Sequence, residues 1–294
     1  MTNAIGQLLH NESLSAYTTW RVGGNTQALY KPTSIDDVER FLIQLPKNEP
    51  VLWLGLGSNS LIRDAGFAGT TIITQGGLHG LRLLDNQRVY VEAGVSCAQM
   101  ARFCARNQLA GGEFWAGIPG TMGGALRMNA GCFQAETWPL VVEVETITRF
   151  GERRRRLASE FEFAYRQVTG LQPDEWFISA ICQLTPGDSV ESMHKIKTLL
   201  AHRAATQPTS EYNCGSVFRN PPGAFAARLI EECGLKGKQI GGAMVSEKHA
   251  NFIINCHGQA KAADIEALIK DIQQIVYTQT NIQLIQEVHI IGDQ

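Results

Sequence analysis

The chain has 294 residues, of which 44% are hydrophobic and 18% charged, and its formal net charge is −2. A charge this close to zero gives no reason to expect a nucleic acid or an anionic membrane as a partner, no apolar stretch is long enough to span a membrane, and Met1 to Glu12 lacks the basic and apolar regions of a secretory signal. The length predicts two or three domains with a sizeable core.

The N-terminal part of the sequence alternates helix and strand signals. A Ser-x-x-Asp and a Ser-x-x-Gln motif are typical of helix N-caps and predict helices over 34–45 and 96–107. Four consecutive arginines, Arg153 to Arg156, lie beside Gly151 and favour a solvated strand or hairpin over a binding patch. Apolar runs predict strands at 51–54, 70–74, 89–91, 140–150, 162–167 and 176–184.

The C-terminal part begins with a turn at 186–189 that opens a helix. Residues 205–210 have the composition of a linker. The pattern predicts a mixed α+β architecture, with one larger domain to about residue 205 and a smaller domain after it. Four apolar residues are expected to share one face of the helix that follows the turn: Val190, Met193, Ile196 and Leu200. Beyond the linker we expect helices at 225–233 and 262–277, and strands at 251–256 and 283–291.

Two glycine-rich turns, each after an apolar run, are the strongest functional signal. Residues 55–60 form the first and residues 117–124 the second. Glycine lets backbone N–H groups approach an anion closely, and two such nests suggest a ligand with a pyrophosphate, such as a nucleotide or dinucleotide cofactor. Ser60 stands where a Rossmann fingerprint has its third glycine, and no P-loop is present. By spacing alone, the first turn is therefore either a phosphate site or an ordinary tight turn.

The seven cysteines are scattered and form no Cys-x-x-Cys motif. Most have apolar neighbours and are expected to be small core residues, a usage that fits a reducing cytoplasm. The histidines are scattered too, so no metal site is expected. The cysteines are Cys97, Cys104, Cys132, Cys182, Cys214, Cys233 and Cys256.

Two charged residues could carry chemistry. Alternation on the predicted last strand places Glu287 on one face with Ile285, His289 and Ile291. It is either an acid or anchor with a raised pKa, or an edge-strand residue that reaches solvent. Arg166 is predicted to share a strand face with Glu162 and Ala164, opposite Phe161, Phe163 and Tyr165. It could hold an anionic group through paired hydrogen bonds, or it could form a surface salt bridge.

Ser216 is a third candidate. It lies between Gly215 and Val217 without a Gly-x-Ser-x-Gly elbow, so an α/β-hydrolase is not supported. It is either a structural residue or a proton donor, and the second role requires neighbours that stabilise its alkoxide.

A series of short motifs then identifies a family. They are Tyr17–Gly24, Leu54–Asn59, Gly117–Gly124, Arg127–Gly131, Tyr165–Arg166, Gly215–Pro221, Ser246–Phe252 and Glu287–Val288. With them, the chain from about Tyr17 to Gly292 resembles the UDP-N-acetylenolpyruvoylglucosamine reductases, flavoenzymes of bacterial peptidoglycan precursor synthesis. The short segment 168–175 resembles the compact type II subclass, which lacks an inserted subdomain.

The resemblance implies an FAD-binding fold of the vanillyl-alcohol-oxidase type. Two α+β subdomains, 1–75 and 76–205, would be followed by an α+β substrate domain, 206–294, whose last strand, 283–292, could return to the FAD domain. FAD would be bound non-covalently. The residues that match its contacts are Arg21, Gly23, Gly55, Gly57, Ser58, Asn59, Ser60, Gly117, Pro119, Gly120, Thr121, Gly123, Gly124, Asn129 and Gly131.

The resemblance also implies a reaction. NADPH reduces FAD, and flavin N5 then delivers hydride to UDP-N-acetylglucosamine enolpyruvate, a small-molecule substrate. By carry-over, Ser216 matches the proton donor, while Arg166 and Glu287 match the residues that stabilise the enolate. A protonated carboxylic acid at residue 287 could donate a hydrogen bond to the developing oxyanion. Substrate contacts match Tyr165, Arg219, Asn220, Lys248 and His249. We expect a cytoplasmic monomer.

Three positions depart from the family pattern. His289 stands where the family generally has Arg, Phe133 where it usually has Tyr, and Asn25 where Pro is common. Two other functions remain open from the sequence. One is a flavoprotein of the same fold that oxidises a hydroxy acid or sugar lactone, and the other is a nucleotide-binding protein that has lost catalysis.

Overall fold

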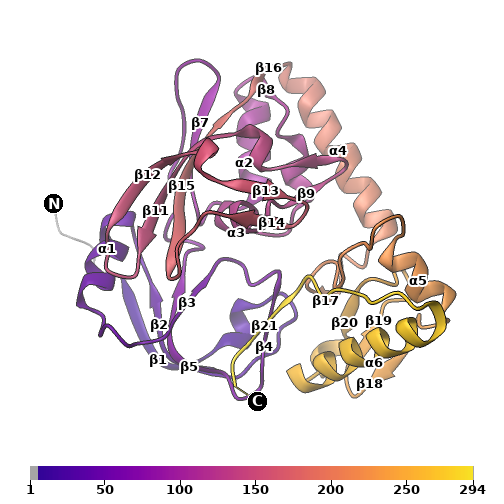
Figure 1. The fold of residues 1–294 in the computed structure, drawn as a ribbon. Helices are drawn as coiled ribbons and strands as arrows, with labels where there is room; N and C mark the ends of the chain where they lie inside the picture. Colours follow the sequence, from indigo (N-terminus) through magenta and orange to yellow (C-terminus); the bar gives the residue numbers. More distant parts are fainter. Residues whose placement is uncertain (1–5, 294) are drawn as a thin grey trace. The chain divides into compact units, whose positions relative to one another are not determined.

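The computed structural model describes residues 6–293, so part of the segment Met1 to Glu12, in which no signal was expected, lies outside the described residues. The chain divides into two compact units. Unit 1 comprises the described part of Met1–His10 with Ala28–Leu56 and Gly69–Ala201, and unit 2 comprises Asn11–Gln27, Gly57–Ala68 and His202–Gln294. Both units are therefore assembled from separate stretches of chain (Figure 1).

The cap motifs form the helix starts that they predict. Ser34 Oγ accepts a hydrogen bond of 3.1 Å from the Asp37 backbone N–H, and Ser96 forms a reciprocal capping box with Gln99. The described α-helices are α1 (Ile35–Gln44), α2 (Cys97–Arg106), α3 (Met122–Met128), α4 (Ser189–Thr206), α5 (Ala226–Glu232) and α6 (Ala262–Thr280). Short 3₁₀ helices are η1 (Leu14–Tyr17), η2 (Glu113–Gly117), η3 (Trp138–Leu140), η4 (Ala158–Glu160) and η5 (Cys256–Gly258).

Helix α4 corrects two expectations. It continues through Thr206, so Ala205 and Thr206 are helical rather than part of a linker. Val190 is 78% exposed and does not join the buried face, on which Ile196 is buried. Val190 lies in the first turn of the helix, in which Ser192 and not Val190 is buried.

The strands of unit 1 centre on a five-stranded sheet in the order β12-β11-β15-β7-β6, in which all neighbours are antiparallel. These strands are β6 (Leu81–Leu83), β7 (Arg88–Glu92), β11 (Val141–Thr148), β12 (Arg153–Leu157) and β15 (Glu175–Gln183). Smaller pairs are β8 (Leu109–Ala110) with β16 (Thr185–Pro186), β9 (Gly131–Cys132) with β10 (Ala135–Glu136), and β13 (Glu162–Ala164) with β14 (Gln167–Thr169).

A second sheet has the order β1-β2-β5-β3, and its β3 runs parallel to β5, with Val51 opposite Thr70. Its strands are β1 (Gln7–Ser13), β2 (Asn25–Lys31), β3 (Val51–Leu54) and β5 (Phe67–Ile73). Strand β3 ends directly before the first glycine turn, as the apolar run before that turn predicts.

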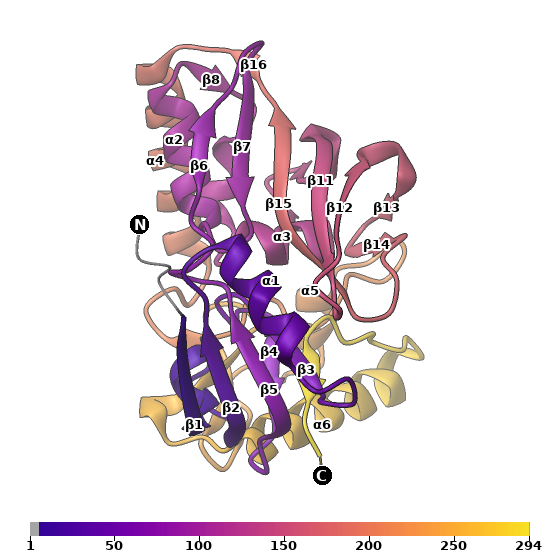
Figure 2. The same ribbon diagram turned by 90° about the vertical axis from the view of Figure 1, so that its left-hand side faces the viewer.

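Two hydrophobic clusters stabilise unit 1. In the larger, α2 buries Cys97, Met100, Ala101 and Cys104 at helical spacing against the five-stranded sheet. In the smaller, Val38 and Leu42 of α1 pack with residues such as Ile178 of β15. Figure 2 shows α1 and α2 on different sides of this sheet. The sheet therefore has helices on both faces.

The predicted strand 162–167 is wrong. Residues 162–169 instead form the hairpin β13–β14, with Ala164 opposite Gln167. Tyr165 and Arg166 are its two-residue turn, and Arg166 has φ of 56°. Arg166 therefore does not share a strand face with Glu162 and Ala164. Of the aromatic residues assigned to the other face, Phe161 is buried, whereas Phe163 and Tyr165 are exposed.

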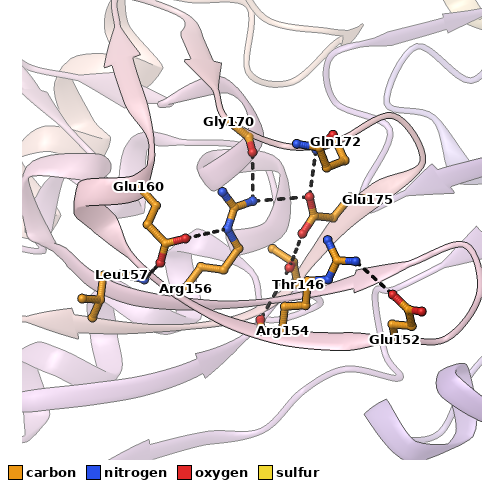
Figure 3. A network of polar contacts seen from close by, with 9 residues as sticks. All are labelled: Thr146, Glu152, Arg154, Arg156, Leu157, Glu160, Gly170, Gln172 and Glu175. Carbon is orange, nitrogen blue, oxygen red and sulfur yellow. Dashed lines mark hydrogen bonds and ion pairs between the residues drawn. The ribbon is translucent and has the colours of Figure 1, made fainter.

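The four arginines form the edge strand β12 of a hairpin with β11, as predicted. Arg156 donates to Glu160 and to the buried Glu175, which also accepts from Thr146 and from the Gln172 backbone (Figure 3). Arg154 pairs with Glu152, and Arg153 with Glu145. These carboxylates neutralise much of the positive charge of the four arginines, which agrees with a solvated strand.

Unit 2 is organised around a four-stranded sheet in the order β17-β20-β19-β18, against which α6 packs (Figure 1). Its strands are β17 (Tyr212–Asn213), β18 (Gln239–Ile240), β19 (Ala243–Val245) and β20 (Ile253–Asn255), and a separate parallel pair joins β4 (Ser60–Ile62) to β21 (His289–Ile291). The predicted helix stripe of α6 is confirmed, because Ile265, Leu268, Ile272 and Val276 are fully buried.

The predicted last strand is shorter than expected. Only His289–Ile291 forms β21, and residues 283–288 join their neighbours by the isolated bridge between Phe218 and Gln286. Pro221 has no backbone N–H and limits how far a ladder beside residues 217–219 can extend. Ile285 is 61% exposed, so the predicted face of isoleucines around Glu287 does not exist.

All seven cysteines are free thiols, and Cys97, Cys104, Cys182 and Cys214 are buried, which confirms most of the expected core placement. Within residues 6–293, no group of three or more potential ligands could hold a metal ion. None of the described helices is both long and apolar enough to cross a membrane.

Candidate active site

In unit 1, the two glycine turns meet. Gly55 follows β3, and the second turn connects η2 to α3. A Cβ at residue 55 would collide with Thr121 Oγ1. The two turns therefore approach one another only because residue 55 is glycine.

The second turn is fixed on one side and open on the other. Its backbone is hydrogen-bonded to the segment 93–97 through Cys97 N to Gly120 O at 2.9 Å, Met122 N to Val95 O at 2.8 Å and Gly123 N to Ala93 O at 2.9 Å. Gly124 is exposed, and the atom nearest to a Cβ placed on it would be 3.9 Å away. Gly117 is buried beneath the turn, and Pro119 is exposed. Such a loop can present its open face to a ligand without rearranging.

The segment after α3 contacts the hairpin that carries Arg166. Arg166 Nη2 donates to Gly131 O at 2.8 Å, and the guanidinium carbon lies 4.9 Å from the centre of the Tyr165 ring. Asn129 Nδ2 donates to Ala164 O at 3.2 Å. Tyr165 is 45% exposed. Unit 1 therefore brings together Asn129, Gly131, Tyr165 and Arg166, which come from two separate motifs.

In unit 2, the segment 17–24 lies along the rest of the first glycine turn. The Thr19 N–H donates to Gly57 O at 3.3 Å, and the Gly24 N–H donates to Arg63 O at 3.0 Å. Gly57 has φ of 59°, and a Cβ there would collide with Tyr17 O, so this close approach requires glycine. Arg21 is exposed and donates to Ala16 O at 2.5 Å.

The loop that carries Ser216 is held at both ends. The Cys214 thiol lies 3.7 Å from Gly57 O and 3.8 Å from Ser60 O, and burial raises its pKa to about 12, so it remains a protonated donor. Asn251 is buried and holds the other end of the loop, at Phe218. Its Oδ1 accepts from Phe218 N at 2.9 Å, and its Nδ2 donates to Phe218 O at 2.8 Å. Ser216 itself is only partly buried.

Glu287 joins the same group through backbone and side-chain hydrogen bonds. Its N–H donates to Val217 O at 2.8 Å, and its carbonyl accepts from Asn59 Nδ2 at 3.2 Å. The His289 N–H donates to Asn59 O at 3.0 Å. The turn 57–60, the Ser216 loop and the Glu287 segment are therefore one hydrogen-bonded cluster within unit 2.

The cations between residues 219 and 248 do not form a single free cluster. Three of them are in ion pairs, namely Arg228 with Glu232, Lys236 with Glu231 and Lys238 with Asp271. Lys248 Nζ donates to Ala204 O. Asn220 Oδ1 accepts from Ala226 N at 3.0 Å and so caps α5. Burial lowers the pKa of His249, which is therefore neutral at pH 7.

Two polar atoms in unit 2 are buried without a hydrogen-bond partner in the described chain: Thr19 Oγ1 and Arg219 Nε. Buried polar atoms are normally paired, so both are positions where a bound ligand could supply the missing partner. Thr19 lies against the first glycine turn, and Arg219 follows the Ser216 loop. Within unit 2, these two atoms are therefore suited to a ligand that carries polar or charged groups.

Sequence reasoning missed three residues of this cluster. Thr19, Cys214 and Asn251 each lie within or beside a recognised motif, but their roles depend on contacts between segments that are distant in sequence. The only available signal was local, since an amide between Ala250 and Phe252 is surrounded by apolar residues and needs hydrogen-bond partners if it is buried.

Comparisons with known proteins agree with this arrangement. A family described as FAD binding domain matches residues 26–155, and one described as UDP-N-acetylenolpyruvoylglucosamine reductase, C-terminal domain, matches residues 207–291. The UDP-N-acetylenolpyruvoylglucosamine reductase of Legionella pneumophila strain Corby is 68% identical over 293 residues, which cover 100% of this chain and 95% of that protein. The enzyme of the same name from Alkalilimnicola ehrlichii is 52% identical over 98% of this chain and 96% of its own length.

A solved structure gives the same result. The UDP-N-acetylenolpyruvylglucosamine reductase of Thermus caldophilus superposes with a TM-score of 0.82 at 30% sequence identity, over 98% of this chain and 99% of that one. The similarity therefore extends over both units and all of the motifs.

Proposed function

Because the chain belongs to the UDP-N-acetylenolpyruvoylglucosamine reductase family, we propose that NADPH is its hydride donor and that Ser216, Arg166 and Glu287 carry the second half of its reaction. The chain is an FAD-binding oxidoreductase that reduces UDP-N-acetylglucosamine enolpyruvate in peptidoglycan synthesis. The observation that supports the roles of Ser216 and Glu287 is the cluster of unit 2, in which the first glycine turn is hydrogen-bonded to the neighbours of Ser216 and to Glu287.

The glycine turns at 55–60 and 117–124, which include Asn59 and Thr121, would hold FAD. When bound, FAD supplies the hydride that is added to the terminal vinyl carbon of the substrate. The other residues then act on the charge that this addition creates on the adjacent carbon and carboxylate.

Arg166 is permanently protonated and would stabilise the enolate by charge and hydrogen bonding. Glu287, as a carboxylic acid, would donate a second hydrogen bond to the same oxyanion. The Ser216 hydroxyl would transfer its proton to the substrate carbon and form the new C–H bond. The alkoxide left on Ser216 would be reprotonated from solvent. Cys214 and Asn251 would hold the Ser216 loop in place during this transfer.

The proposal extends to the other substrate contacts and to the setting. Tyr165, Arg219, Asn220, Lys248 and His249 would contact the sugar nucleotide, and the unpartnered Nε of Arg219 supports a ligand there. Two FAD subdomains, 1–75 and 76–205, would precede a substrate domain, 206–294; the family matches support an FAD-binding part followed by a C-terminal domain from about residue 207. The seven free thiols support a location in the reducing cytoplasm. We also propose that the enzyme is a monomer.

Separate measurement of the two half-reactions tests the proposal. In anaerobic stopped-flow absorbance, Ser216→Ala should be reduced by NADPH at the wild-type rate, whereas its reoxidation by the enolpyruvyl nucleotide should slow by about 10²–10⁴-fold, because a general acid is lost. Ser216→Cys should keep part of the rate, because a thiol also donates.

The matched control is Ser210→Ala, at an exposed turn of the same unit, and it should match wild type in both half-reactions. Equal slowing of both half-reactions in Ser216→Ala would show that Ser216 is structural. Wild-type protein that oxidises NADPH without any dependence on the enolpyruvyl nucleotide would refute the proposed reaction.

A further inference from the structure

The position of Arg166 needs support from outside its own hairpin. Strands β13 and β14 have three residues each, and Glu162, Phe163 and Ala164 are exposed. A two-stranded hairpin of this size is marginally stable alone. Arg166 also has φ of 56°, a left-handed conformation that costs a non-glycine residue free energy. Something must hold the tip of the hairpin if the guanidinium is to be placed accurately.

The support comes from the segment that follows α3. Asn129 Nδ2 donates to Ala164 O at 3.2 Å, directly before the turn, and Arg166 Nη2 donates to Gly131 O at 2.8 Å. Two residues of one segment thus hold the backbone and the side chain of the hairpin tip. Phe163 stacks on Trp138 with ring centres 5.8 Å apart, which adds an apolar contact on the same side.

The hydrogen-bond donors of the Asn129 side chain are all used within the protein. It is completely buried and lies at the left-handed C-cap of α3, with φ of 41°. Its Nδ2 also donates to Glu136 Oε2 at 2.9 Å, and its Oδ1 accepts from Trp138 N at 3.0 Å. An amide nitrogen has two hydrogens, and both are used by Glu136 and Ala164. No donor is left for a cofactor.

From this geometry we infer that Asn129 is a positioning residue for Arg166 and not a cofactor contact, as its motif alone would suggest. It acts through Ala164 O, while Gly131 O fixes the guanidinium. The inference rests on the proposed role of Arg166 in enolate stabilisation. It predicts that loss of the Asn129 donors misplaces Arg166 and slows only the step that needs it.

The test uses Asn129→Asp in the FAD-loaded enzyme. Aspartate tolerates the left-handed backbone and keeps the acceptor for Trp138 N, but it cannot donate to Ala164 O or Glu136. Flavin is first reduced chemically with dithionite, which makes the experiment independent of NADPH, and is then mixed with the enolpyruvyl nucleotide. Because a displacement of about 1 Å can cost about 10²-fold in rate, reoxidation should slow by about that factor. The dissociation constant of FAD should stay at its wild-type value.

Two further variants separate positioning from stability. Thr137→Val is the matched control, since Thr137 is fully buried and its hydroxyl is hydrogen-bonded to Ala130 O at 2.7 Å and to Trp115 Nε1 at 3.1 Å, neither of which belongs to the hairpin. It should lower the melting temperature but not the reoxidation rate.

In Asn129→Asp, the new carboxylate faces the carboxylate of Glu136. Adding Glu136→Gln removes this repulsion and should restore the melting temperature. Reoxidation should nevertheless stay slow, because Ala164 O still lacks a donor. Combined with Arg166→Lys, Asn129→Asp should slow reoxidation by less than the product of the two single effects.

Three outcomes would overturn the inference: weaker FAD binding in Asn129→Asp, an unchanged reoxidation rate, or recovery of that rate together with melting temperature in the double variant. Failure of the proposed function has a different signature, because wild type and Thr137→Val would then also fail to be reoxidised by the enolpyruvyl nucleotide.

Discussion

Glu266 of α6 is the carboxylate on which the pH dependence of unit 2 should rest. Arg63, directly after β4, donates to it through Nε at 2.9 Å and Nη2 at 3.1 Å, and Lys270 Nζ lies 2.8 Å from its Oε1. Arg63 Nη1 also donates to Gly292 O. These bonds connect the segment after the first glycine turn to α6 and to the residue after β21, so they stabilise the framework around Ser216 and Glu287.

The hydrogen bond from Arg63, followed by that from Lys270, lowers the pKa of Glu266 from 4.5 to about 2. The side chain is 11% exposed, so solvent screens the pair only partly. One pKa unit corresponds to about 1.36 kcal/mol, so the charged form contributes about 3 kcal/mol to the free energy of unfolding. The folded-state pKa is the lower one. The contribution is therefore fully present above pH 4.5 and is lost as pH falls from 4.5 towards 2.

We expect Glu266→Gln to have a free energy of unfolding about 3 kcal/mol below wild type at pH 7, with a difference that shrinks towards zero near pH 2. Urea unfolding, monitored by tryptophan fluorescence at matched FAD concentration, measures it without screening the ion pair. The control, Glu232→Gln, makes the same change in the exposed pair with Arg228 and should cost about 0.3–0.5 kcal/mol. A Glu266→Gln deficit that is equal at pH 7 and pH 3 would refute the reasoning.

Two other predictions follow from the site. Because the glycine turns and the orphan Thr19 hydroxyl offer only non-covalent contacts, acid precipitation of the purified yellow protein should release the FAD absorbance into the supernatant, and colour retained in the pellet would contradict this. Asn220→Asp keeps the acceptor for Ala226 N but adds a negative charge, so it should raise KM for the enolpyruvyl nucleotide while leaving the melting temperature nearly unchanged. An unchanged KM would remove Asn220 from the proposed substrate contacts.

Local signals predicted those parts of the fold that local chemistry determines. The N-caps at Ser34 and Ser96 and the apolar stripe of α6 depend on residues within one or two helical turns, and each is confirmed. The hairpin at 162–169 was missed because Arg166 adopts a left-handed turn conformation for which glycine or asparagine is the usual signal. Only its bonds to the segment after α3 explain why arginine occupies that position.

At the last strand, a local sequence pattern was present but did not predict the structure. Period-two alternation around Glu287 was present in the sequence, but Ile285 is exposed because the segment pairs through one isolated bridge and not through a ladder. The family motifs named Asn59 and Glu287 as site residues, and the structure adds that the Asn59 side chain donates to the Glu287 carbonyl. They did not predict the contacts of Cys214 and Asn251, because those contacts join segments that are far apart in the chain.

The pairing of β4 with β21 has a consequence for biosynthesis. Asn59 and Glu287, which meet beside this pair, are separated by 228 positions, and at roughly 5–20 residues per second the ribosome needs on the order of 10–50 s to make the intervening chain. During that time β4 has emerged without its partner, and Leu61, a fully buried core residue of the finished unit, lacks part of its environment. The β4–β21 pair of unit 2 can form only after β21 has been made, so the nascent chain carries β4 without its partner until then.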